Sequence, residues 1–159
     1  MSASKQVGSS GKTPSNPRHR AREFVVQGIY QHLVGGQDAA AIIVQAESAA
    51  GFERANRELY DALLDGILKE ESILQTLIEP YIERPWVEIS PIERGILLLA
   101  ACELRQHPET PGRVIINEAI ELTKSYGGTD GHKFVNGVLD KLAQELRADE
   151  LRPQAGATK

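Results

Sequence analysis

The sequence contains a single cysteine, Cys102, and no run of apolar residues long enough to cross a membrane. One cysteine cannot form an intrachain disulfide, which favours a reducing compartment. Aromatic residues make up only 5% of the chain, so a core must be built mainly from Leu, Ile, Val and Ala. The N-terminus also lacks the apolar segment of a secretion signal. These absences indicate a soluble cytoplasmic protein, and 159 residues with 41% hydrophobic content suffice for one domain with a buried core.

The patterns of common catalytic and metal sites are also absent. No two of the four histidines stand three or four residues apart, and no cysteine or carboxylate completes a zinc pattern. There is no phosphate-binding loop, dinucleotide fingerprint or serine-hydrolase elbow. Glu118 and Glu121 lie on adjacent turns of one predicted helix and could form an acid/base pair, but a solvated helix face explains them better. We therefore expect a protein that is not an enzyme and has no cofactor or metal.

Positive charge is concentrated at one end of an otherwise acidic chain. The first 22 residues contain two lysines and three arginines and no acid, which makes this segment +5 and leaves −9 for the rest. Arg18, Arg20 and Arg22 fall in the first two turns of a predicted helix, where the helix dipole disfavours cations. Arg18 and Arg22 share a face at i, i+4 that could bind successive phosphates of a nucleic acid. The alternative is a set of ordinary surface arginines.

Hydrophobic periodicity is helical almost throughout, and alternating strand patterns are absent. The sequence predicts an all-α fold of six to seven helices in two packed helical subdomains. Residues 1–16 are expected to be a disordered basic extension, 17–150 the helical domain, and 151–159 a disordered tail.

Several helix boundaries can be read from capping residues. Asn16 followed by Pro17 predicts the first helix, and Thr110 followed by proline predicts a later one. Ser90, with proline next and Glu93 at the third position, forms a capping box that opens an almost wholly apolar central helix. One long helix is expected over residues 52–79, a glycine stop at Gly127, and a last helix that begins at Asp130.

The stretch "YGGTDGHK", residues 126–133, allows two interpretations. Backbone amides at a helix N-terminus and Lys133 could position a phosphate, while Tyr126 could stack on an unpaired base. Alternatively, the stretch is a corner between helices in which Asp130 caps the last helix and Phe134 belongs to the core. Residue chemistry alone leaves both open.

Four segments, in order and spacing, resemble the NusB family of transcription antitermination factors. They are "RHRAREFVVQGIYQ", "SPIERGILLLAACEL", "VIINEAIELTKSYG" and "HKFVNGVLDKL". The resemblance extends from about Arg18 to Leu146. It implies a fold of two small helical subdomains and a role in suppressing transcription termination. It also implies binding to boxA RNA within the RNA polymerase antitermination complex, together with NusE, a ribosomal protein of the small subunit.

The resemblance further implies which residues act. The RNA contacts would be made by the start of the first helix and by the loop before the last helix, here Arg18, Arg20, Arg22, Tyr126, Asp130, Lys133 and Phe134. The NusE surface would include Tyr30 and Glu93, although Glu93 is also explained as a capping-box residue. Two other functions remain open: an RNA-binding module of a ribosomal RNA methyltransferase, which would need a further α/β domain, and a helical adaptor without an RNA role. Some relatives are homodimers, so a homodimer is a further expectation.

Overall fold

The computed structural model describes residues 16–126 and 130–151, and within them every regular element is helical. The α-helices are α2 (Pro17–Gly35), α3 (Ala39–Glu47), α4 (Arg57–Lys69), α5 (Glu71–Ile78), α6 (Pro91–Gln106), α7 (Gly112–Tyr126), α8 (Gly131–Leu146) and α9 (Ala148–Leu151). Short 3-10 turns are η1 (Phe52–Arg54), η2 (Glu79–Tyr81) and η3 (Trp86–Glu88). The expected all-α fold is confirmed, with slightly more helices than predicted.

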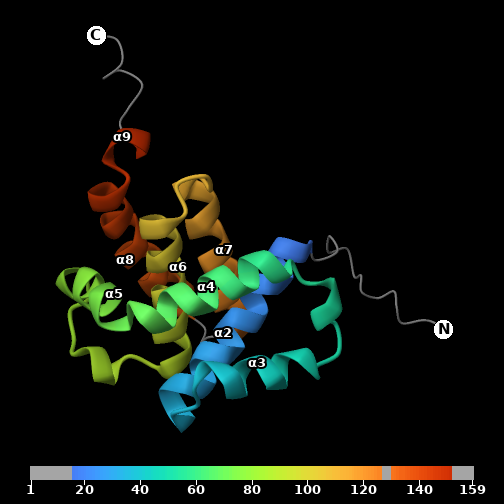
Figure 1. The fold of residues 1–159 in the computed structure, drawn as a ribbon. Coiled ribbons are helices and arrows are strands. Elements are labelled where there is room, and N and C mark those ends of the chain that lie inside the picture. Colours follow the sequence, from blue (N-terminus) through green and yellow to red (C-terminus); the bar gives the residue numbers. More distant parts are fainter. Residues whose placement is uncertain (1–15, 127–129, 152–159) are drawn as a thin grey trace.

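The helices form two groups that meet at α6 (Figure 1). Helices α2, α3 and α4 pack together as one group, and α5, α7 and α8 surround the other side of α6. Every residue of α6 from Gly95 to Leu104 is buried, as its apolar sequence predicts. Helix α6 is therefore the shared core element of both groups. None of the helices in the described ranges has the length and apolarity needed to span a membrane.

Two predicted helix starts are formed as expected. The side chain of Asn16 accepts a hydrogen bond from the amide of His19 at 2.7 Å, with Pro17 in the first helical position. The Ser90 hydroxyl accepts from the amide of Glu93 at 3.2 Å. Helix α2 ends at Gly36, which has φ 72°, a conformation that glycine adopts without strain. These local signals fix where the two central helices begin.

The prediction of one long helix over residues 52–79 is wrong. The chain forms η1, α4 and α5 instead, with Asn56 capping α4 and Glu70 separating α4 from α5. The carboxylate of Glu70 accepts hydrogen bonds from Arg105 at 2.9 Å and Gln106 at 2.6 Å, both near the end of α6. The break at Glu70 contains no proline or glycine, and the helical periodicity continues through it. The sequence pattern therefore gives no sign of the break.

Arg147 also closes the C-terminal end of α6. Its guanidinium, buried just after α8, donates to the backbone oxygens of Glu103, Leu104, His107 and Thr110 at 2.9 to 3.2 Å. The last carbonyls of a helix have no partner within the helix, so this one side chain satisfies several of them at once. It also ties α8 to α6.

His32 joins the end of α2 to the start of α5. Its Nδ1 lies 3.0 Å from the carbonyl oxygen of Gln37, and its Nε2 lies 2.8 Å from Oε1 of Glu71. Both neighbours accept hydrogen bonds, so both ring nitrogens must carry protons to satisfy them. Burial by itself lowers the pKa of His32, but the hydrogen bonds to Gln37 and Glu71 outweigh it and raise the pKa above the usual 6.5.

We expect Gly28→Ala to destabilise the fold by about 1–3 kcal/mol, because the added methyl must displace packed atoms. A Cβ at Gly28 would lie 2.6 Å from Cγ2 of Ile42, a stiff β-branched side chain on α3. Gly137→Ala on α8 is the control, since nothing lies within 4 Å of its Cβ position. That change should be neutral or stabilising by up to about 1 kcal/mol. Chemical denaturation measures both, and equal effects would contradict close packing of α2 on α3.

The His32 contacts predict a pH-dependent contribution to stability. A raised pKa in the folded protein means that the contribution is complete below about pH 6.5 and is lost as pH rises through the folded pKa. The free energy of unfolding of the wild type, minus that of His32→Gln, should therefore fall with rising pH in this window. Denaturation at a series of pH values measures this difference. A pH-independent difference would show that the imidazolium is not the stabilising form.

Candidate nucleic-acid interface

The three arginines at the start of α2 point to three different environments. Arg18 is exposed, and its Nη2 lies 3.5 Å from the hydroxyl of Thr110, just before α7. Arg20 is half-buried, and a Cβ added at Gly51 would lie 3.1 Å from its Nη1, so its guanidinium lies over the turn between α3 and η1. Arg22 is only 3% exposed. Arg18 and Arg20 are thus the arginines of this group that a ligand in solution can reach.

Arg22 forms a two-pronged ion pair with Glu103 in the core. Its Nε lies 2.6 Å from Oε2 and its Nη2 2.9 Å from Oε1 of Glu103, which is itself buried in α6. Burial lowers the pKa of Arg22, but the bond to Glu103 outweighs this and raises it, so the guanidinium stays charged. The expectation that Arg22 shares an exposed face with Arg18 is therefore wrong. The sequence carried one signal for this pair: an acid within an otherwise apolar run.

Glu118 of α7 lies against the same helix start. Its Oε1 lies 2.7 Å from Nδ1 of His19 and 3.8 Å from Nη1 of Arg22, and Nε2 of His19 lies 3.4 Å from Glu23. The expectation of a solvated face is thus wrong for Glu118, whose side chain is 22% exposed, and holds for Glu121, which is exposed. These acids hold His19 and Arg22 in place but also weaken the positive potential at the start of α2.

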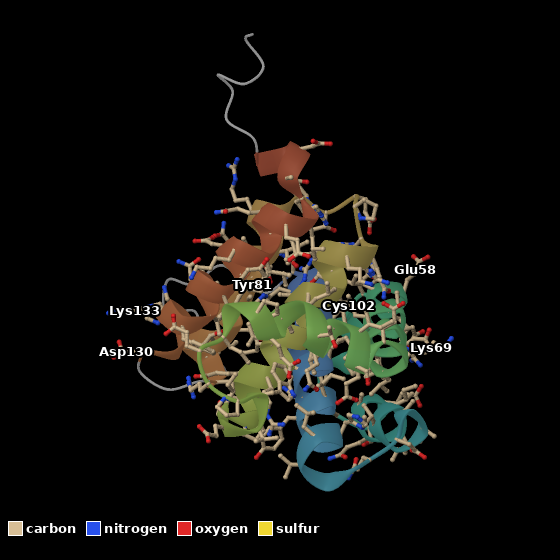
Figure 2. The ribbon with its side chains drawn as sticks, turned by 90° about the vertical axis from the view of Figure 1, so that its left-hand side faces the viewer. Glu58, Lys69, Tyr81, Cys102, Asp130 and Lys133 are labelled. Carbon is tan, nitrogen blue, oxygen red and sulfur yellow. The ribbon has the colours of Figure 1, made fainter. Side chains whose placement is uncertain are left out.

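The start of α8 presents a second group of predicted residues. Asp130 stands at the N-cap position, so the last helix begins where the sequence predicts, but its side chain does not make the capping hydrogen bond of the second interpretation. Instead, its Oδ1 lies 3.6 Å from Nζ of Lys133, and both side chains are about three-quarters exposed. Figure 2 shows the two residues projecting together from one side of the molecule. The expected stop at Gly127 lies outside the described residues.

Tyr126 and Phe134 line this corner from inside. Tyr126 is half-buried against the core, and its hydroxyl accepts a hydrogen bond from Nε2 of Gln27 at 3.0 Å. Burial raises the pKa of Tyr126, so the hydroxyl is neutral at physiological pH. Phe134 is also half-buried, and the guanidinium of Arg84 lies 4.8 Å from its ring centroid. The sequence analysis missed Arg84, and nothing in its local sequence marks it.

The predicted partner residues lie on two different elements. Tyr30 on α2 is 42% exposed, and Val34, one turn later, is 58% exposed, which makes an apolar patch at the end of this helix. The carboxylate of Glu93 lies against the first turn of α8, since a Cβ at Gly131 would lie 2.5 Å from its Oε2. An acid is favourable there because the helix dipole is positive at its N-terminus.

Possible metal ligands are scattered over residues 16–126 and 130–151. No cluster of three His, Cys, Asp or Glu in those ranges could hold a metal ion. Burial raises the pKa of the Cys102 thiol to about 12, so it stays protonated and is a poor nucleophile.

Comparison with known proteins identifies the family. The model of the NusB family matches residues 19–144. The chain belongs to the NusB family. It is 51% identical over 146 residues to the transcription antitermination protein NusB of Dechloromonas aromatica, covering 92% of this chain and 90% of the relative. It is 55% identical over 134 residues to the protein of the same name from Aromatoleum aromaticum, covering 84% and 92%. The resemblance seen in the sequence motifs is confirmed.

Solved structures agree with the NusB assignment. The structure of T. maritima NusB has a TM-score of 0.70 and 31% identity, covering 83% of this chain and 94% of that one. The complex of antitermination factors NusB and NusE with double-stranded RNA has a TM-score of 0.68 and covers 80% and 96%. At 20% identity, the second match shows only that the fold is shared.

We expect the Arg22–Glu103 pair to show strong coupling in unfolding experiments. Arg22→Met or Glu103→Leu alone should cost about 3–5 kcal/mol, because each leaves one buried charge without a partner. The double variant should be far more stable than the sum of the two losses predicts, since it removes both charges. Arg105→Met is the control: it breaks the exposed pair with Glu70 and should cost far less than either buried change, because solvent screens exposed pairs. Additive losses would contradict a buried pair.

Proposed function

We propose that this protein is an RNA-binding transcription antitermination factor that acts without catalysis in the cytoplasm. In partnership with NusE it binds the boxA element of nascent ribosomal RNA and, as part of the RNA polymerase antitermination complex, suppresses termination. The observation that carries this proposal is identity of about one half, along almost the whole chain, to proteins named transcription antitermination protein NusB. Similarity of this extent over the whole fold supports a shared binding function.

The described cations support a modest RNA affinity. Arg18 and Arg20 at the start of α2 and Lys133 at the start of α8 are accessible and lie next to helix N-termini, which attract phosphate. Each cation that contacts a phosphate on single-stranded RNA releases counterions, so binding weakens as salt rises. Glu118 and Glu23 lie close to the start of α2, so this protein alone offers few net positive charges to RNA there. A partner that adds its own RNA contacts is therefore required for tight binding.

The remaining predicted residues take specific roles in this proposal. Asp130 orients Lys133, and Phe134 with Arg84 above its ring offers a flat, cationic surface for an unpaired base. Tyr126 contributes mainly by holding Gln27. Arg22 acts indirectly, because its bond to Glu103 fixes the helix that carries Arg18 and Arg20. Tyr30 and its exposed neighbour Val34 supply the apolar part of the NusE surface, and Glu93 its polar edge.

The decisive experiment compares boxA RNA with a scrambled RNA of the same composition, with and without NusE. We expect NusE to increase affinity for boxA more than for the scrambled RNA. Equal binding of the two RNAs in the presence of NusE would overturn the antitermination proposal and leave a helical adaptor. Fluorescence anisotropy at several salt concentrations gives both the affinity and its salt dependence.

Two lysines allow a matched test of the α8 corner. Lys133 and Lys69 are equally exposed, at 74%, and each pairs with an aspartate three or four residues before it in the chain. Figure 2 shows them on opposite sides of the molecule. Lys133→Glu should weaken boxA binding several-fold and lower the slope of log affinity against log salt by about 0.7. Lys69→Glu should leave both unchanged. Equal effects of the two changes would show that only net charge matters and would exclude a phosphate contact at Lys133.

A further inference from the structure

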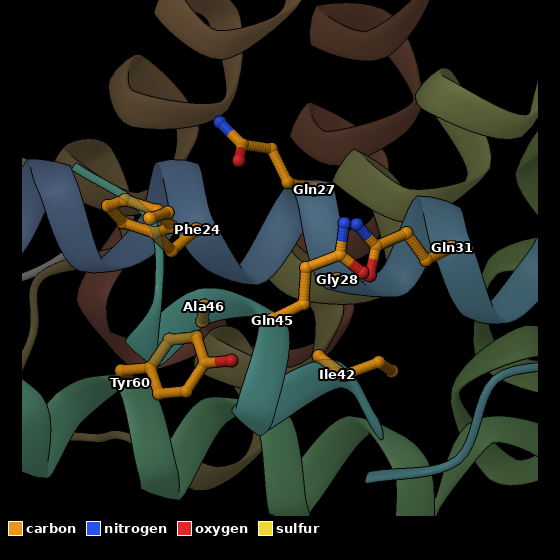
Figure 3. A pocket seen from close by; sticks show the side chains of 9 residues that line it. Phe24, Gln27, Gly28, Gln31, Ile42, Gln45, Ala46 and Tyr60 are labelled. Atoms are coloured by element: carbon orange, nitrogen blue, oxygen red, sulfur yellow. The ribbon is translucent and has the colours of Figure 1, made fainter. Parts of the chain in front are cut away.

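A small cavity lies between α2, α3 and α4. It has a volume of about 90 Å³, and Phe24, Gln31, Gln45, Ala46 and Tyr60 form most of its wall (Figure 3). None of its lining residues is charged. The cavity is partly open to solvent beside Gln45, which is exposed on α3. The antitermination proposal does not use this cavity.

Two polar atoms in the cavity wall have no hydrogen-bond partner among the described residues. They are the hydroxyl oxygen of Tyr60, a residue with 0% exposure, and Oε1 of Gln31. A buried polar atom without a partner is costly, so native proteins nearly always satisfy it with protein, water or ligand. Figure 3 shows the side chains of Tyr60, Gln31 and Gln45 around the same cavity.

The Tyr60 hydroxyl cannot easily turn away to find water. The ring of Phe52 packs edge-on against the Tyr60 ring with centroids 4.9 Å apart, and Phe24 packs edge-on against Phe52 at 5.0 Å. These aromatic contacts hold the phenol in its present direction. The amide of Gln45 is exposed and can rotate, so the cavity can open on the side of Gln45 while the Tyr60 hydroxyl stays fixed.

The wall chemistry defines what can bind. A phenol and two amides offer both donors and acceptors, and Phe24 adds a flat apolar surface. Without a charged side chain, the cavity does not favour a phosphate or a metal ion. Its volume is below the roughly 150 Å³ of a cavity that holds a benzene ring, so only one edge of a ring can enter. The polar edge of an unpaired nucleobase meets these conditions.

The position of the cavity fits a path for RNA along α2. Arg20 lies one helical turn before Phe24, with its guanidinium over Gly51, close in sequence to Ala49 of the cavity wall. On the other side, Gln27 lines the cavity and reaches the hydroxyl of Tyr126. A cation that can hold a phosphate and a residue bonded to the tyrosine at the end of α7 thus lie on the same stretch of α2 as the cavity.

The geometry points to a base-reading site: the Tyr60 hydroxyl and the amides of Gln31 and Gln45 hydrogen-bond the edge of one unpaired RNA base. Arg20 holds the phosphate next to that base. This inference rests on the proposed RNA-binding function and adds sequence discrimination to it.

The test uses the complex with NusE and a set of boxA RNAs, each with one base removed to leave an abasic position. For the wild type, one abasic position should reduce affinity by about two- to tenfold, the value of one or two lost hydrogen bonds. Tyr60→Phe and Gln45→Ala should bind intact boxA that much more weakly and should be insensitive to the same abasic position. Tyr81→Phe is the control, since its hydroxyl bonds Glu145 outside the cavity; it should behave as wild type.

Stability separates this role from a structural one. Tyr60→Phe removes only an oxygen without a partner, so the free energy of unfolding should be unchanged or higher. If every abasic position affects wild type, Tyr60→Phe and Gln45→Ala equally, the cavity holds water only and the inference is overturned. The proposed function still stands in that case if the protein prefers boxA over scrambled RNA. If wild type shows no such preference, the proposed function fails and this inference with it. If Tyr60→Phe fails to fold, Gln45→Ala still tests the inference, because Gln45 is exposed and its truncation should not unfold the protein.

Discussion

The buried ion pair between Arg22 and Glu103 is the contact on which the arrangement of this protein depends. It joins α2, which carries the exposed cations, to α6, the helix around which both groups of helices pack. Two charges in a core are tolerated only with close geometry and full hydrogen bonding, so the pair accepts one relative placement of the two helices. Arg22 is directed inward, whereas Arg18 at the helix end is exposed and the guanidinium of Arg20 lies over the turn at Gly51. The same contact thus organises the core and fixes the helix that carries the accessible arginines.

Charged side chains also connect the ends of the helices around α6. Arg147 satisfies the last carbonyls of α6, Glu150 accepts from the first amide of α7 at 2.6 Å, and Glu93 lies against the start of α8. In each case a side chain from one helix completes the end of another, where backbone groups lack partners. The two corners that we assign to RNA are therefore held at fixed positions by contacts between helices, which suits a surface that must match a defined ligand.

Local sequence signals succeeded where a structural feature depends on residues close together in the chain. The starts of α2 and α6 were predicted correctly, because their caps join residues three apart. The break at Glu70 was not, because it is fixed by Arg105 and Gln106, some 35 residues later. Asp130 has the residue type of a helix cap, yet its carboxylate pairs with Lys133. The helix-capping propensity of aspartate favours a hydrogen bond to the backbone, but the ion pair with Lys133 competes for the same carboxylate.

The sequence by itself determined the family, the all-helical class and the boundaries of the best-capped helices, because these follow from periodicity, motifs and short-range hydrogen bonds. Only the tertiary structure decided which of three similar arginines is buried. Arg18, Arg20 and Arg22 have the same chemistry, and the difference comes from Glu103, 81 residues away. The cavity beside Tyr60 is likewise formed by three helices, each with an ordinary sequence. Burial and cavity shape depend on distant partners, and no local pattern contains them.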